Sequence, residues 1–145
     1  MKPIQFSREK VLQALCQWLV SGGEISQIEL QFLNHIRSKT SKKFFSNLFI
    51  NIPNKISLLD EIIRPSLDKE LNKIGPTEKA VLYIGVYELK FQPEVPYRVV
   101  IDEAIRLSKL YGAEGAYKLI NSSLDQIAKE LRRVEVSDSK NTKIY

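Results

Sequence analysis

The 145-residue chain has only one cysteine and one histidine, and this scarcity narrows the chemistry open to it. Because Cys16 is alone, the chain cannot form an internal disulfide or bind zinc through a cluster of cysteines. His35 is the only histidine, which excludes a metal site built from several imidazoles. Cys16 lies among leucines at helical spacing, so we expect it to be a small core residue.

Long apolar runs are also missing. No segment approaches the roughly 20 consecutive apolar residues that a membrane-spanning helix needs, and the first residues lack the apolar core of a signal peptide. We therefore expect a cytoplasmic protein without a membrane segment. The chain is long enough for one domain with a hydrophobic core of its own.

The common catalytic motifs are absent as well. The sequence contains no nucleotide-binding glycine loop, no serine-hydrolase elbow and no zinc-protease histidine pair. The adjacent acids Asp60-Glu61 and Asp102-Glu103 would point about 100° apart on a helix, so neither is a natural acid–base pair. Residues 112–115 could form a small anion site before the next helix, or simply a corner between two helices. We expect no enzymatic activity and no cofactor.

Helical periodicity runs through almost the whole chain. Apolar residues recur every three to four positions in seven segments, which are separated mainly by the glycines and prolines at which helices commonly end. The predicted helices span about 7–21, 25–36, 41–52, 54–67, 76–89, 97–111 and 116–131. The fifth is apolar on nearly all sides, so we expect it at the centre of the molecule.

The predicted fold is therefore all-α, with about seven helices in two packed subbundles. Pro53 divides the pattern, which gives subbundles of about 1–52 and 54–133 within a single domain of residues 1–133. Pro65 is expected to kink the fourth helix. Glu88 must face the rim or have a partner, because an unpaired buried charge is costly. Residues 134–145 are polar, and we expect a disordered tail.

Positive charge is concentrated in one part of the first half. The net charge is +5 and the isoelectric point is near 9.3, which favours an anionic partner. No acidic residue occurs between Glu29 and Asp60. The cations of this window are Arg37, Lys39, Lys42, Lys43 and Lys55. Residues 37–43, which we call the basic turn, are either a solvated surface or a binding site for phosphates, and the sequence leaves both open.

Four segments of the second half occur in an order and spacing that resemble the NusB family of transcription antitermination factors. They are residues 75–89, with a Glu-Lys-Ala opening and a Tyr-Glu-Leu close, residues 95–105, residues 111–114 and residues 118–121. The first half matches more loosely, at Met1-Lys-Pro3, Arg8-Glu9 and Gln13-Ala-Leu15. The resemblance covers about residues 1–131.

The resemblance implies a non-enzymatic, all-α adaptor. Members of this family pair with the ribosomal protein NusE and together bind the boxA RNA element, within an RNA polymerase antitermination complex on ribosomal RNA operons. By this resemblance Glu78 faces NusE. The residues expected to contact RNA are Lys2, Arg8, Lys10, Lys118 and Asn121.

The N-terminal segment departs from the family pattern. Residues 4–7 are Ile-Gln-Phe-Ser where arginines usually cluster in the family. The loss of these cations should lower the affinity for RNA phosphates. The cations of the basic turn could replace that charge if they lie on the same side of the molecule. They are Arg37, Lys39, Lys42 and Lys43.

Two alternatives remain open. One is a protein–protein adaptor with weakened RNA binding, which the arginine-poor N-terminus favours. The other is an accessory domain related to those of ribosomal RNA cytosine methyltransferases. The short stretch after residue 131 leaves no room for a methyl-donor domain, so we expect a stand-alone factor.

Overall fold

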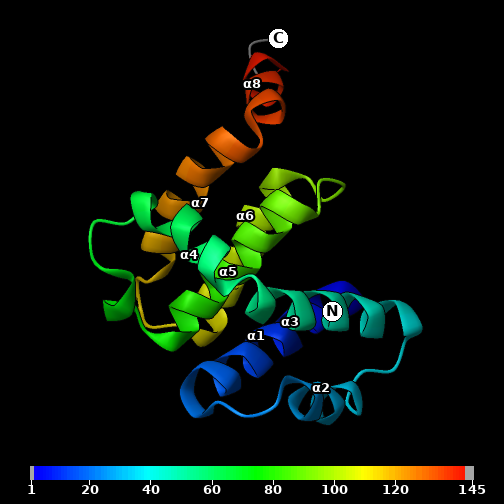
Figure 1. The fold of residues 1–145 in the computed structure, drawn as a ribbon. Coiled ribbons are helices and arrows are strands. Elements are labelled where there is room, and N and C mark those ends of the chain that lie inside the picture. Colours follow the sequence, from blue (N-terminus) through cyan, green and yellow to red (C-terminus); the bar gives the residue numbers. More distant parts are fainter. Residues whose placement is uncertain (1, 143–145) are drawn as a thin grey trace.

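The structure, a computed structural model, describes residues 2–142, which form eight α-helices and two short 3₁₀ turns (Figure 1). The helices are α1 (Pro3–Ser21), α2 (Ile25–Leu33), α3 (Lys39–Asn54), α4 (Ile56–Ile63), α5 (Pro76–Phe91), α6 (Tyr97–Tyr111), α7 (Tyr117–Leu131) and α8 (Arg133–Thr142). Within this part of the chain there is no strand, and no helix is long and apolar enough to cross a membrane. The all-α prediction is confirmed.

Most helix ends follow local sequence signals, but several differ from the prediction: α1 begins at Pro3 rather than near residue 7, and α2 ends at Leu33 rather than near residue 36. Gly22 ends α1 at a φ of +71°, a conformation that glycine adopts without strain. Ser38 caps α3, because its side chain accepts a hydrogen bond from the Ser41 amide at 3.0 Å, so this helix begins earlier than expected. Pro53 lies inside the last turn of α3 and the helix ends one residue later. Pro65 does not kink a helix; α4 ends at Ile63, and a 3₁₀ turn follows.

Helix α5 lies at the centre of the molecule, as its apolar sequence predicts (Figure 1). Every residue from 80 to 89 is buried. Helices α1, α2 and α3 pack against one another on one side, while α4, α6 and α7 pack around α5 on the other. Because α5 also packs against α1 and α3, the two helical groups share one continuous core.

Helix α8 differs from the predicted disordered tail. The guanidinium of Arg132 donates hydrogen bonds to the carbonyl of Leu89 at 2.7 Å and to the carboxylate of Glu135 at 2.6 Å. Glu135 in turn accepts a hydrogen bond from the Tyr97 amide at 2.8 Å. All of these contacts are polar, and those to Leu89 and Tyr97 are also distant in sequence, so a search for apolar periodicity does not find them. Residues 143–145 of the predicted tail lie outside the described residues.

Candidate nucleic-acid interface

The N-terminal ends of α1 and α3 lie side by side. The hydroxyl of Ser7 donates a hydrogen bond to the carbonyl of Ser41 at 3.0 Å, and both residues are buried. Pro3 and Phe6 of α1 line the same cavity as residues 35–38. The basic turn therefore lies beside the first turn of α1. It is thus on the same side of the molecule as the N-terminal segment, which is the condition for its cations to replace the missing arginines.

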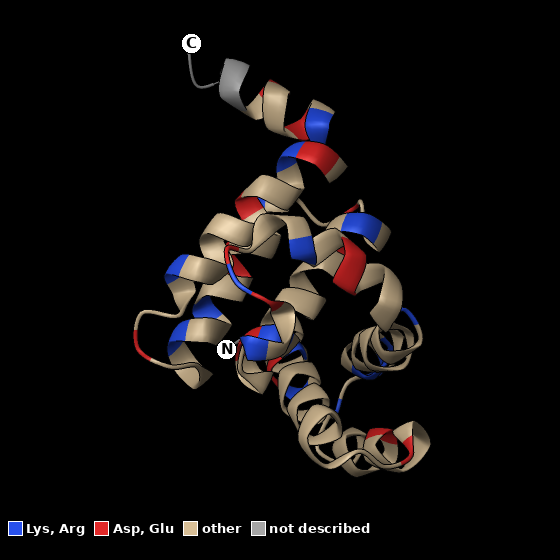
Figure 2. Cartoon of the chain, turned by 60° about the vertical axis from the view of Figure 1, so that its left-hand side comes forward, with Lys and Arg blue, Asp and Glu red and all other residues tan. Residues whose placement is uncertain are grey.

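The cations of the basic turn are free to meet a partner. Arg37, Lys39, Lys42 and Lys43 are all exposed, and none forms an ion pair with another described residue. Figure 2 shows basic residues in the loop before α3 and on α3 itself, whereas the preceding helix α2 carries acidic ones. Unpaired exposed cations on one surface make a region of positive potential that attracts phosphates.

Arg8 does not belong to this exposed surface, which contradicts its predicted contact with RNA. Arg8 as a whole is only 5% exposed to solvent. The guanidinium donates two hydrogen bonds to Glu88, at 2.9 and 2.8 Å, and one to Glu103 at 3.3 Å. Glu88 is 1% exposed, so Arg8 is the partner that a buried carboxylate requires. Sequence spacing gave no sign of this pair, because its members are 80 positions apart.

The ion-pair network continues from Arg8 to the surface of α6. Arg106 bonds Glu103 at 2.9 Å and Glu9 at 2.8 Å, and the Tyr111 hydroxyl donates to Glu9 at 2.7 Å. Burial alone would raise the pKa of Glu9, but the hydrogen bonds from Tyr111 and Arg106 outweigh it and leave that pKa below its ordinary value. The network fixes the N-terminal half of α1 against α5 and α6.

Lys2 and Lys10 remain as the cations of the N-terminal segment. Lys2 is exposed and immediately precedes α1. Lys10 is half-buried; its ammonium lies 5.1 Å from the centre of the Phe6 ring and donates a hydrogen bond to Gln13 at 3.4 Å. Lys2 lies just before α1 and Lys10 lies within it, and because α1 borders the basic turn, both can add to the same positive surface.

Lys118 and Asn121 are exposed in the first turns of α7, on a different part of the molecule from the basic turn. Helix α6 packs against both α1 and α7. Asn121 borders a cavity of about 460 Å³ together with residues of α6, including Ile105. The two groups of predicted RNA-binding residues therefore lie at two helices, α1 and α7, that both pack against α5 and α6.

Glu78 lies at the start of α5 and is half-buried. Its carboxylate accepts a hydrogen bond from the Ala113 amide at 3.2 Å. The corner at residues 112–115 thus already holds a carboxylate of the chain itself, so it joins α6 to α7 rather than offering an empty anion site. The outer edge of Glu78 borders a cavity of about 400 Å³ with Lys69 and Leu119, and its contact with a protein partner stays a prediction.

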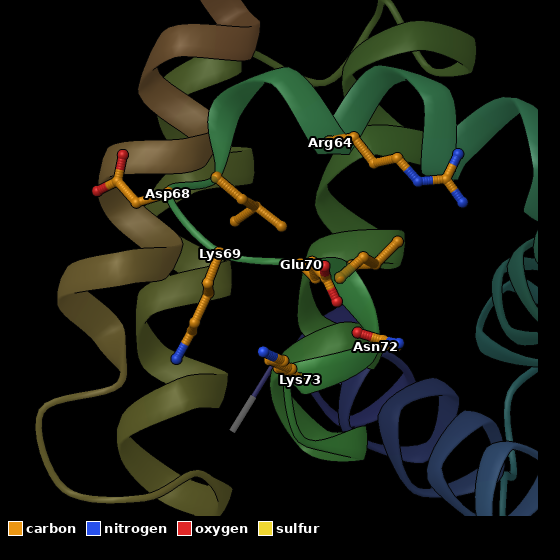
Figure 3. Close-up of a pocket in the computed structure, with 8 residues that line it drawn as sticks. Arg64, Asp68, Lys69, Glu70, Asn72 and Lys73 are labelled. Carbon is orange, nitrogen blue, oxygen red and sulfur yellow. The ribbon is translucent and has the colours of Figure 1, made fainter.

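A further hollow of about 760 Å³ lies along the connector between α4 and α5 (Figure 3). Its lining carries both signs of charge, with Lys69 and Lys73 beside Asp68 and Glu70. In Figure 3 Arg64 and Asp68 point away from each other, and the labelled side chains do not converge on one point. The hollow offers no arrangement of acid, base and nucleophile.

The sequence reasoning missed three residues that the fold brings together. Phe6, His35 and Ser41 come from α1, the α2–α3 loop and α3, and they line one cavity beside the basic turn. Phe6 was noted only as a replacement for an arginine. No spacing signal links these positions, because the contact arises from the packing of α1 on α3.

Comparisons with known proteins agree with the fold and the sequence motifs. The family model described as "NusB family" matches residues 5–129. The chain is 41% identical to transcription antitermination protein NusB of Alcanivorax borkumensis over 133 residues, covering 91% of this chain and 89% of that protein. It is 38% identical to the protein of the same name from Hahella chejuensis over 144 residues, covering 99% and 97%.

Solved structures give the same result. The structure of T. maritima NusB matches with a TM-score of 0.83 and 33% identity, over 90% of this chain and 93% of that one. A structure of the antitermination factors NusB and NusE in complex with dsRNA matches with a TM-score of 0.81. That match has 24% identity and covers 89% of this chain and 98% of the other, so it supports the fold alone.

Proposed function

Because this chain belongs to the NusB family, we propose that it is an RNA-binding adaptor in transcription antitermination. It binds boxA RNA of ribosomal RNA operons together with the ribosomal protein NusE, as part of an RNA polymerase antitermination complex. It acts in the cytoplasm, and it acts by binding rather than by catalysis. Support for the antitermination role comes from the name shared by the relatives, transcription antitermination protein NusB, and the partners are those of the family that the sequence motifs resemble.

One observation of this chain carries the RNA-binding part of the proposal. The exposed cations of the basic turn lie beside the first turn of α1, where Lys2 adds a further charge. Each cation that neutralises a phosphate releases counterions, which favours binding at low salt. The basic turn thus supplies positive charge that the arginine-poor N-terminus lacks. Arg8 cannot supply it, because its guanidinium forms a buried ion pair with Glu88.

The adaptor works by combining two weak surfaces. Cations of the basic turn hold the RNA backbone in position, while NusE binds a separate surface that includes Glu78. Contacts to phosphates set the position of the strand without reading its sequence. A complex with NusE would bind RNA more tightly than either protein alone, because the second contact becomes intramolecular once the first has formed.

The test is a fluorescence-anisotropy titration of a boxA-like single-stranded RNA with the full chain, with and without purified NusE. The proposal predicts tight binding with NusE and weaker binding without it, with an affinity that falls as salt is raised. An RNA of the same length without the boxA sequence is the control. Equal binding of both RNAs would contradict the boxA assignment.

A second function, a protein–protein adaptor without RNA binding, has one observation in its favour. With Arg8 buried, only Lys2 and Lys10 remain as cations in the N-terminal segment, and Lys10 is partly engaged by Phe6 and Gln13. In the same titration this alternative predicts that NusE binds the chain while RNA binds neither the chain nor the complex.

A further inference from the structure

A cavity of about 320 Å³ opens at the junction of α1, the α2–α3 loop and α3. Its apolar lining comes from Pro3, Phe6 and Ile36, and His35 borders it as well. Small-molecule sites in proteins are commonly roughly 300–1,000 Å³. The cavity is at the small end of that range, so it suits one compact group rather than a peptide or a folded nucleic acid.

Ser41 lines this cavity and has one buried polar group without a partner. The residue is 3% exposed, and its backbone groups are engaged: the amide bonds Ser38 and the carbonyl accepts from Ser7. Its side-chain hydroxyl, in contrast, has no hydrogen-bond partner. Buried hydroxyls without a partner are unfavourable and uncommon in folded proteins, which suggests that a ligand completes this one.

The surroundings of the cavity are cationic. Arg37 is part of the lining, and Lys39 begins α3 next to the capping residue Ser38. An apolar, partly aromatic cavity is a poor site for a phosphate itself, because it cannot replace the water that the anion loses. A flat ring that carries polar edge groups and is joined to a phosphate fits both the cavity and its surroundings.

We propose that this cavity receives a single unstacked nucleobase of the bound RNA. The base stacks against Phe6 or His35, its polar edge reaches the hydroxyl of Ser41, and the adjoining phosphates lie near Arg37 and Lys39. Single-stranded RNA is commonly recognised in this way, by stacking on aromatic side chains and by hydrogen bonds to base edges. This inference rests on the proposed RNA-binding function and adds a base-reading site to it.

Two substitutions separate base binding from electrostatic attraction. Phe6→Leu keeps an apolar side chain but removes the aromatic face, and Ser41→Ala removes the hydroxyl that has no partner. We expect Phe6→Leu to weaken binding of the boxA-like RNA, with NusE present, by about 5- to 150-fold, the range typical of losing one stacked base. Neither substitution should change the slope of affinity against salt, since no charge is lost.

The closing experiment is a double-mutant cycle with abasic RNAs. One abasic nucleotide is placed at each position of the RNA in turn, and each RNA is titrated with the wild-type chain, Phe6→Leu and Ser41→Ala, all with NusE. The proposal predicts one position at which the abasic RNA combined with a substitution costs no more binding free energy than either change alone. Thermal melting of each variant confirms that it is folded, and Ser41→Ala should melt no lower than the wild type.

The outcomes distinguish this inference from the function on which it rests. If the wild type binds RNA but the substitutions act independently of every abasic position, the base site is refuted and the adaptor function stands. If Phe6→Leu weakens NusE binding in the absence of RNA, the cavity serves the protein partner instead, which also refutes the base site. If the wild type binds no RNA, both proposals fail.

Discussion

Replacing Arg8 by methionine should remove the partner of a buried carboxylate and destabilise the whole fold. Glu88 is 1% exposed, and both of the side-chain hydrogen bonds described for its carboxylate come from Arg8. Glu103 keeps its bonds to Arg106, so the loss is concentrated at Glu88. Removing one partner of a buried ion pair commonly costs about 3–5 kcal/mol. We therefore expect the free energy of unfolding of Arg8→Met to fall by about that amount.

Urea denaturation of the wild type and the variant measures this difference directly. In thermal melting, about 3 °C for each kcal/mol corresponds to a fall in Tm of roughly 10–15 °C. Arg106→Met is the matched control: its side chain is 24% exposed, and the carboxylates that it leaves keep other partners, Tyr111 for Glu9 and Arg8 for Glu103, so its cost should be clearly smaller.

The double variant Arg8→Met/Glu88→Leu completes the cycle. With both charges gone no buried charge is left unpaired, so most of the lost stability should return. A loss below about 1 kcal/mol for Arg8→Met would refute the argument, because it would mean that Glu88 is not dependent on this partner. A double variant as unstable as the single one would refute it equally.

Three further predictions concern stability. The free energy of unfolding should decrease as pH falls below the ordinary carboxyl pKa of 4.5. Burial alone would raise the pKa values of Glu9 and Glu103, but hydrogen bonds from Tyr111 and Arg106 to Glu9, and from Arg106 to Glu103, outweigh it and lower both. A pH series of urea melts should show this loss of stability in acid, and Arg106→Gln should reduce it. Gly85→Ala should cost about 1 kcal/mol in the same assay, because the added Cβ would lie 2.7 Å from Leu124 Cδ1 in a filled core, and a more stable variant would contradict that packing. Arg132→Ala should leave the carbonyls of Leu89 and Gln92 without this partner and speed amide hydrogen exchange throughout α8, whereas unchanged exchange would show that α8 is held by other contacts.

The sequence predicted most of the helices because each one buries an apolar stripe, and that stripe is visible as local periodicity. The central position of α5 followed in the same way from its apolar sides. Even the requirement for a partner at Glu88 could be stated in advance from the cost of an unpaired buried charge. The identity of that partner could not, because Arg8 and Glu88 are brought together only by the packing of α1 on α5.

In the candidate site, too, the features that depend on neighbouring residues could be predicted from the sequence, whereas those that depend on distant residues could not. The clustering of cations at residues 37–43 is a property of the sequence, but its place beside the first turn of α1 is a property of the fold. Arg8 was expected on the RNA surface because of its charge and position, and its burial removes it. The polar contacts of Arg132 and Glu135 explain why α8 was missed, since helix prediction relied on apolar spacing.

The most direct test of RNA binding through the basic turn is the salt dependence of RNA affinity for Lys42→Glu/Lys43→Glu, measured with NusE present. If each lysine neutralises one phosphate, the slope of log affinity against log salt should become shallower by roughly 1.4. The control variant, Lys129→Glu/Arg133→Glu, makes the same change of charge at exposed positions in the last turn of α7 and at the start of α8, and should leave the slope unchanged. Equal slopes for the wild type and the basic-turn variant would contradict the account.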